Sequence, residues 1–300
     1  MPRRQIEAKL KPVATNFLFS GEPFIVKRDG EMALPNPLLQ KMTPYWLSFD
    51  ENSAGTNRLL LSAQEIGFAT MTNDFGGDIE IYALTGDQDD LDYTFLLKDH
   101  QSGSEFMNRK IHAQTVIGTN ERPFFLPFPI LIDRDQVIDL EARNGANDNV
   151  TKGIVQTYLG HRYYFDINDL QYKEFGALSR SLRTYFYTTD NDVALVANGN
   201  EASFITMRSD AFFYWKRISF FSDGEFKLNI KRANSSVEFN NVEINSNAFA
   251  GNRERYWDFR LPMVLSPKER LRFEFTDLSG NPNRIFVTLT GANFYANIGV

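Results

Sequence analysis

Cysteine is absent from the 300-residue chain, which rules out disulfides, thiolate catalysis and cysteine-ligated metals together. Histidine occurs three times, at His100, His112 and His161, and no two of these stand at a spacing that favours a shared metal. We interpret each histidine as a loop or strand-end residue. The sequence therefore predicts no metal site and no bound cofactor.

Long apolar runs are also missing, and none approaches the ~20 residues of a transmembrane helix. At the start of the chain two arginines are followed by charged residues, Glu7, Lys9 and Lys11, instead of the apolar core of a secretory signal. We expect synthesis in the cytoplasm and no membrane partner. The net charge of -6 gives no reason to expect nucleic acid as a partner either, although a local basic patch stays possible.

Familiar catalytic motifs are missing too: there is no G-x-S-x-G elbow, no P-loop and no H-E-x-x-H. Asp87, Asp89, Asp90 and Asp92 in the acidic loop 86–92 could supply oxygen ligands to a cation, but the loop lacks the glycine and glutamate of an EF-hand. We interpret it as a solvated turn and leave cation binding open. We expect no enzyme, and only carboxylates converging from separate strands would make one.

Aromatic residues are abundant at 14%, with 27 phenylalanines and 12 tyrosines, which favours packing between β-sheets. Short runs of alternating polar and apolar residues recur along the chain, and Gly, Asn, Asp and Pro separate them. We find no long helical stripe. The pattern predicts an all-β protein of antiparallel β-sandwiches that resemble jelly rolls.

Two stretches share one pattern, since residues 129–144 align with residues 262–277 at an offset of 133. Apolar positions alternate in phase in both, and residues 157–164 then align with 288–295, which places Gly160 on Gly291. Upstream we align residues 77–84 with 224–231, and this leaves residues 85–110 as a long insert in the first copy. The sequence predicts a duplicated domain.

We expect an N-terminal arm at 1–22, a first sandwich at 23–165, a linker at 166–181 and a second sandwich at 182–300. The linker has mixed charge and could form a short helix. In the arm, the apolar residues from Phe17 to Phe19 need a partner, which is either the chain's own domain or a neighbouring subunit.

Two aromatic stretches hold Trp215 and Trp257, each beside cationic residues. An exposed aromatic ledge could stack on sugar rings or on single-stranded nucleic acid. Alternation favours a different interpretation, in which these strands lie in a core or are covered on both faces by a neighbouring domain or subunit.

The last forty residues resemble a phrase common near the ends of tailed-bacteriophage virion structural proteins. In that phrase a strand near a proline is followed by an L-x-F-x-F strand, an Asp-Ser-Gly turn and a strand that ends in L-x-G. The match is carried by Leu271, Phe273, Phe275, Asp277, Ser279, Gly280, Leu289 and Gly291. The first copy matches more loosely, and no single family is assigned.

The resemblance implies a non-enzymatic part of a virion: a head decoration or minor capsid protein, or a collar component where head meets tail. Its partners would be other virion proteins and further copies of itself. We expect subunit contacts at Arg3, Arg4, Phe17 and Phe19 in the arm and in the insert 85–110. The alternative is a carbohydrate-binding module that stacks sugars on Trp215 and Trp257. The sequence leaves the position in the particle, the copy number and the symmetry open.

Overall fold

The computed structural model describes residues 42–49, 58–74, 77–87, 91–145, 151–163, 182–190, 194–235 and 237–295. Antiparallel strands make up nearly all of the regular structure in these residues, so the prediction of an all-β fold is confirmed. The helices α3 (Ala113–Val116) and α5 (Ser246–Phe249) have four residues each. In the described part of the chain, no helix has the length and hydrophobicity needed to cross a membrane.

The first half of the chain forms a sandwich of two four-stranded sheets. One sheet has the order β1 (Met42–Ser48), β10 (Gln156–Tyr163), β4 (Asp78–Gly86), β7 (Phe124–Ile132). The other has the order β3 (Ile66–Thr72), β8 (Val137–Asn144), β5 (Tyr93–Asp99), β6 (Ile111–His112). A small ladder extends the sandwich at β2 (Leu59–Leu61) and β9 (Lys152–Ile154).

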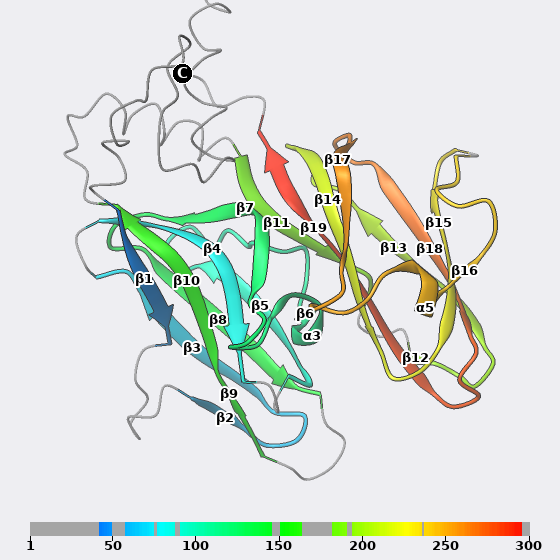
Figure 1. Ribbon diagram of the computed structural model, residues 1–300, viewed down its shortest axis with the longest axis horizontal. Coiled ribbons are helices and arrows are strands. Elements are labelled where there is room, and N and C mark those ends of the chain that lie inside the picture. The colour runs from blue at the N-terminus through cyan, green and yellow to red at the C-terminus, as the bar shows by residue number, and fades with distance from the viewer. Residues whose placement is uncertain are drawn as a thin grey trace, which may run out of the picture.

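The second half repeats this arrangement strand for strand. Its first sheet has the order β11 (Leu182–Thr188), β19 (Asn283–Phe294), β14 (Phe212–Ser222), β17 (Trp257–Leu265), with β12 (Ala194–Leu195) also paired to β19. Its second sheet has the order β13 (Asn200–Thr206), β18 (Arg270–Asp277), β15 (Phe226–Arg232), β16 (Ile244–Asn245). Figure 1 shows the two sandwiches side by side, and each has the eight strands in two sheets of a jelly roll.

The two sandwiches also match residue by residue in their strand bounds and at one β-bulge. From residue 93 to residue 144 every strand matches one in the second sandwich at the constant offset of 133. Both copies also have a β-bulge at the same place, opposite Gly160 in the first and Gly291 in the second. A Cβ atom on Gly160 would lie 2.5 Å from the Glu80 carbonyl oxygen, and one on Gly291 would lie 2.1 Å from that of Tyr214. The repeated glycine is therefore required because two backbones approach closely at the bulge.

One of the three predicted alignments is wrong. Residues 78–84 of the first stretch lie in β4, which pairs with β10, whereas residues 226–231 of the second lie in β15, which pairs with β18. The counterpart of β15 is β5, and the counterpart of β4 is β14. The segment 85–110 is therefore no insert, because it contains the interior strand β5. The alternation of apolar and polar residues matched β4 with the wrong strand of the second copy, because side chains alternate with a period of two in most strands of a sandwich.

Each sandwich has its own core. Trp215 is the largest fully buried side chain of the second core, and its indole Nε1 donates a hydrogen bond of 2.8 Å to the Arg217 carbonyl. The first core contains one residue from the other half, Phe186 of β11. The predicted arm (1–22) and linker (166–181) lie outside the described residues, so the domain limits stay predictions.

Candidate functional site

The contact between the two sandwiches is the most elaborate site in the described residues. The outer face of the β11, β19, β14 sheet packs on α3, β6 and β7 of the first sandwich (Figure 1). Phe186 inserts its ring into the first core, and its backbone bonds to the segment before β6: its N–H donates to the Phe106 carbonyl at 3.0 Å, and its carbonyl accepts from Asn108 at 3.1 Å. The Asn108 side chain holds the backbone of Thr188 at 2.8 and 3.1 Å. The two halves are thus joined by specific backbone contacts.

His112 lies at the centre of this contact and is fully buried. It caps α3, because its Nδ1 accepts a hydrogen bond from the Gln114 N–H at 3.3 Å. The proton of the neutral ring is then on Nε2, which donates to an Asp92 carboxylate oxygen at 3.2 Å. Burial lowers the pKa of His112, and this effect outweighs the hydrogen bond to Asp92, which raises it. The histidine therefore serves the interface as a neutral group.

Arg284 of β19 completes the network from the second sandwich. Its guanidinium lies 3.3 Å from Asp92 of the first sandwich and 2.7 Å from Asp223 of its own. The hydrogen bond from His112 and the charge of Arg284 hold the pKa of Asp92 well below its usual range, against the opposing effect of burial. Asp92 is thus an interface anchor, although its sequence context suggested a solvated turn. Asp89 and Asp90 lie outside the described residues, and in the described part no group of three acidic or histidine side chains could hold a metal ion.

A buried cation forms a second anchor beside this network. The guanidinium of Arg217 lies 3.7 Å from the ring centre of Tyr256 and 5.0 Å from that of Phe124 in the first sandwich. It pairs with Asp258 at 3.1 Å and donates to the carbonyl of Phe125. A cation in this position is stabilised by both the aromatic faces and the carboxylate. The interface therefore combines apolar packing with charges that are already paired.

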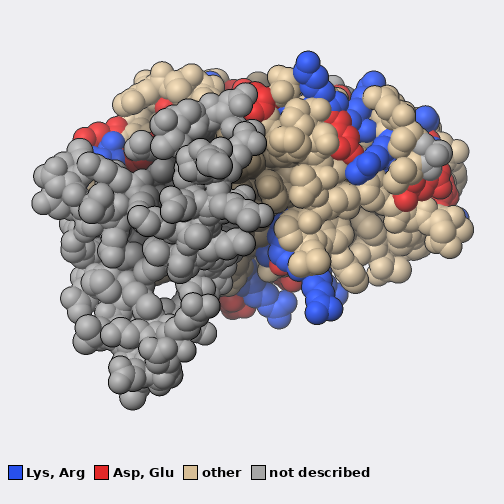
Figure 2. Space-filling view, turned by 90° about the horizontal axis from the view of Figure 1, so that it is seen from above, with Lys and Arg blue, Asp and Glu red and all other residues tan. Residues whose placement is uncertain are grey.

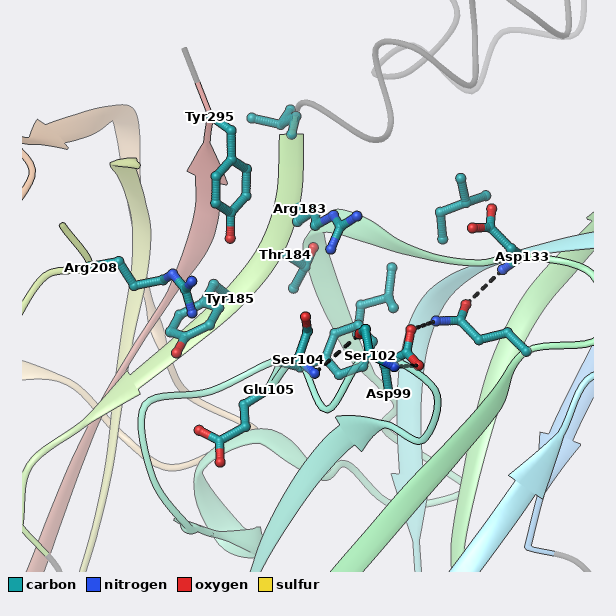
Figure 3. A pocket seen from close by; sticks show the side chains of 15 residues that line it. Asp99, Ser102, Ser104, Glu105, Asp133, Arg183, Thr184, Tyr185, Arg208 and Tyr295 are labelled. Carbon is teal, nitrogen blue, oxygen red and sulfur yellow. Dashed lines mark hydrogen bonds between the residues drawn. The ribbon is translucent and has the colours of Figure 1, made fainter. Parts of the chain in front are cut away.

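A small pocket of about 280 Å³ opens where the two sandwiches meet. Figure 3 shows Arg208, Tyr185 and Tyr295 on the second-sandwich side and Glu105 and Asp99 on the first. Burial raises the pKa of Tyr185 to about 12. Arg208 forms a fork to Asp210 at 2.9 and 3.0 Å, and Asp99 accepts the backbone N–H groups of Gln101 and Ser102 at 2.8 and 3.0 Å. The pocket is at the lower limit of ligand sites in size, and its Arg208 and Asp99 already have partners.

Two half-buried carboxylates along β8 also have side-chain partners. His100 contacts Asp139 at 3.0 Å, and Lys110 contacts Glu141 at 2.7 Å. Both carboxylates alternate with the buried residues of β8 and therefore project from the outer side of their sheet. Lys110 and Glu141 form a surface ion pair, and Asp139 has a contact with the His100 ring, so neither carboxylate stands out as a catalytic group.

The two tryptophans proposed for ligand stacking have opposite environments. Trp215 is buried in the second core, so its ring is not accessible to a ligand, and its assignment as a stacking residue is wrong. Its burial follows from its position in the interior strand β14, with neighbours on both sides in the sheet. Trp257 lies on β17 at the edge of that sheet and is exposed.

The predicted contact residues Arg3, Arg4, Phe17 and Phe19 lie outside the described residues. Within the described residues, sequence reasoning missed the exposed Trp46 on β1 and Leu261 on β17. The repeat contained a signal for Leu261 but none for Trp46, because the aligned stretches do not include β1. Leu261 aligns with Phe128 at the offset of 133, and an apolar residue kept at one position of both copies is a candidate for a shared contact.

Comparison with known proteins gives no relative by sequence: no family model matches the chain, and no curated protein matches it. Solved structures that match include the infectious bursal disease virus VP2 subviral particle (TM-score 0.25, 7% identity, 91% of this chain and 46% of that chain). Another is the tandem CBM51 modules of a family 98 glycoside hydrolase from Streptococcus pneumoniae (TM-score 0.23, 7% identity, 85% of this chain and 100% of that chain). A third is the triple jelly roll of an archaeal virus turret assembly (TM-score 0.20, 9% identity, 80% of this chain and 59% of that chain). The chain spans less than half the length of the VP2 chain, and TM-scores this low carry no argument about function.

Proposed function

We propose that this chain is a non-enzymatic structural component of a virus particle. The carrying observation is the combination of a tightly joined pair of jelly rolls with apolar side chains left exposed on the edge strands β1, β7 and β17, among them Trp46, Phe125, Trp257 and Leu261. Exposed apolar residues on several edge strands favour a building block that contacts several neighbours. Jelly rolls occur in viral capsid domains and in lectin domains, so the fold admits both this function and its alternative.

The resemblance at the end of the chain supports a tailed bacteriophage as the source of the particle, with the chain in the shell or at the head-tail collar. The matched turn has a structural role. Asp277 accepts hydrogen bonds from Asn198 N–H at 2.8 Å, Ser279 Oγ at 2.7 Å and Asn283 Nδ2 at 2.9 Å, and Gly280 follows with a φ of 72°. The shared residues of the phrase thus stabilise a turn between β18 and β19, which fits a scaffold better than a reaction centre.

Surface charge supports protein partners. Figure 2 shows basic and acidic side chains interspersed among uncharged residues on the described part of one face. The net charge of -6 favours neither nucleic acid nor an anionic membrane. The partners under this proposal are other virion proteins and further copies of the chain, and its location is the virion after synthesis in the host cytoplasm.

Quantitative mass spectrometry on density-purified particles tests the proposal. Copies of this chain are counted against the most abundant shell protein. About a dozen copies per particle would place the chain in a ring at the collar or tail, and hundreds would place it on the shell. Absence from the particles would overturn the proposal.

Carbohydrate binding is the second candidate, and the exposure of Trp257 on an edge strand favours it. An indole on a β-sandwich surface can stack on a sugar ring. Titration of host glycans would show saturable binding that Trp257→Ala abolishes. Leu261→Ala on the same strand would retain it, because an aliphatic side chain does not stack on a sugar.

A further inference from the structure

The duplication places the same apolar positions in two different environments. Phe124 and Phe128 on β7 correspond to Trp257 and Leu261 on β17 at the offset of 133. The first pair is 0% and 8% exposed, whereas the second pair is 55% and 79% exposed. Phe124 also belongs to the first core, whereas Phe128 lies in neither core. Both copies of this surface are apolar, and within the described residues only the first copy is covered.

The cover on the first copy is the outer sheet face of the second sandwich. Thr184 of β11 donates its hydroxyl to the Phe128 carbonyl at 2.6 Å, and the Arg217 guanidinium of β14 lies over the Phe124 ring at 5.0 Å. Phe186, two residues after Thr184, completes the cover by inserting into the first core. We call the β11 side of this contact, with Thr184 and Phe186, the donor face. The β7 side, with Phe124 and Phe128, is the receptor face.

The first sandwich has its own copy of the donor face, and this copy is exposed in the described residues. Tyr45 pairs with Gly160 and Tyr185 pairs with Gly291, so β1 corresponds to β11 and Trp46 corresponds to Phe186. Phe186 is 0% exposed, whereas Trp46 is 61% exposed. In the described part of the chain, one copy of each face is therefore covered and the other is exposed.

A polar contact of the interface is also present in duplicate. Asn108 holds the backbone of Thr188 through both atoms of its amide. Its counterpart at the offset of 133 is again an asparagine, Asn241, and this side chain is exposed. The strand position that corresponds to Thr188 is Ser48 on β1. The receptor face of the second sandwich thus keeps the amide that recognises the donor strand.

We propose that a second copy of the chain occupies the open receptor face. The β1 face of one copy, with Trp46, docks on the β17 face of another copy, with Trp257, Leu261 and Asn241, and repeats between chains the contact that joins the sandwiches within a chain. Donor and receptor are different surfaces, so the association is head to tail and closes into a ring or extends as a filament. This inference concerns the chain in solution and does not rest on its incorporation into a particle.

Mixing two complementary variants tests this geometry. Trp46→Asp disrupts the donor face and leaves the receptor face intact. Leu261→Asp disrupts the receptor face and leaves the donor face intact. Sizes are measured by analytical ultracentrifugation at about 100 μM, a concentration that saturates an interface with a micromolar Kd. Wild-type protein will assemble, each variant alone will be a monomer, and an equimolar mixture will stop at two chains, twice the 34.5 kDa of one.

The control is Phe68→Asp on β3 of the other sheet, which is also exposed and will assemble as wild type does. Circular dichroism verifies that each variant is folded. If Leu261→Asp is unfolded, Trp257→Asp replaces it as the variant with a disrupted receptor face. A monomeric wild-type protein, or a variant that assembles like wild type, would overturn the proposal. A mixture that stays monomeric would also overturn it, because it would mean that the two faces do not bind one another.

Discussion

The imidazole ring of His112 lies flat against the ring of Phe221, with centroids 3.8 Å apart and planes 4° apart. His112 belongs to β6 of the first sandwich and Phe221 to β14 of the second, so this stack joins the two halves. Asp92, Arg284 and Asp223 surround it with paired charges. The junction therefore couples the packing of the domains to the protonation of one buried ring.

Stability will fall as the pH drops below about 6.5, the pKa of an unfolded-state histidine. The folded-state pKa of His112 is lowered, so below that pH the unfolded chain binds the proton more readily than the folded chain does. The loss is at most about 1.4 kcal/mol per pH unit from this group. The measurement is the free energy of unfolding between pH 5 and pH 8 in buffers matched in ionic strength.

His112→Asn is the control for this dependence. The second copy has Asn245 at the corresponding position, where it caps α5 by accepting from the Asn247 N–H, so asparagine can replace the histidine cap. The variant will lose the part of the slope between pH 5 and pH 6.5 that comes from His112, and the part from His161, whose pKa burial also lowers, will remain. An unchanged slope would assign the dependence to another group.

Phe186→Ala will destabilise the protein by about 3–5 kcal/mol, because it removes a fully buried ring from the first core. Trp46→Ala changes the corresponding residue in the first sandwich and will stay within about 0.5 kcal/mol, because that ring is exposed in the single chain. Urea unfolding of monomeric samples measures both. Equal losses of unfolding free energy in the two variants would contradict the conclusion that Phe186 is covered and Trp46 is exposed.

Asp277→Ala will cost about 2–4 kcal/mol, because it leaves several donors of the turn after β18 without an acceptor. Burial opposes the charge, but the hydrogen bonds from Asn198, Ser279 and Asn283 outweigh it and hold the pKa of Asp277 well below its usual range. Asp277→Asn keeps one acceptor oxygen and will lose less. Thermal unfolding at neutral pH distinguishes the two, and equal stability of Asp277→Ala and wild type would contradict the role of the carboxylate.

Gly291→Ala will destabilise the second sandwich by about 1–3 kcal/mol through overpacking, because the added Cβ would meet the Tyr214 carbonyl. Gly103→Ala is a contrasting control, since a Cβ there meets no atom within 4 Å and only the positive φ of 67° opposes it. Urea unfolding compares the two variants. A smaller loss at Gly291 than at Gly103 would contradict close backbone approach as the reason for the repeated glycine.

The strands and the duplication could be predicted because β8 and β18 alternate cleanly and share the offset of 133. The alignment of 77–84 with 224–231 failed because alternation records only that a strand has one buried face, and β4 and β15 both have one. The partner of a strand is set by pairing with distant segments, and no local pattern records it.

The interface was not predictable from local sequence. Arg284 and Asp92 are 192 positions apart, and a lone histidine before a four-residue helix has no distinguishing pattern. The contrast between Trp215 and Trp257 has the same cause. Both stand in aromatic stretches, but one strand has two neighbours in its sheet and the other lies at an edge.

The most direct test of the structural role is the incorporation of a receptor-face variant into particles. Density-purified particles are compared by mass spectrometry from infections in which the chain carries Leu261→Asp or the apolar control Leu261→Met. The account predicts wild-type copy number for Leu261→Met and loss of the chain from particles for Leu261→Asp, with both proteins folded in isolation. Full copy number for Leu261→Asp would contradict it.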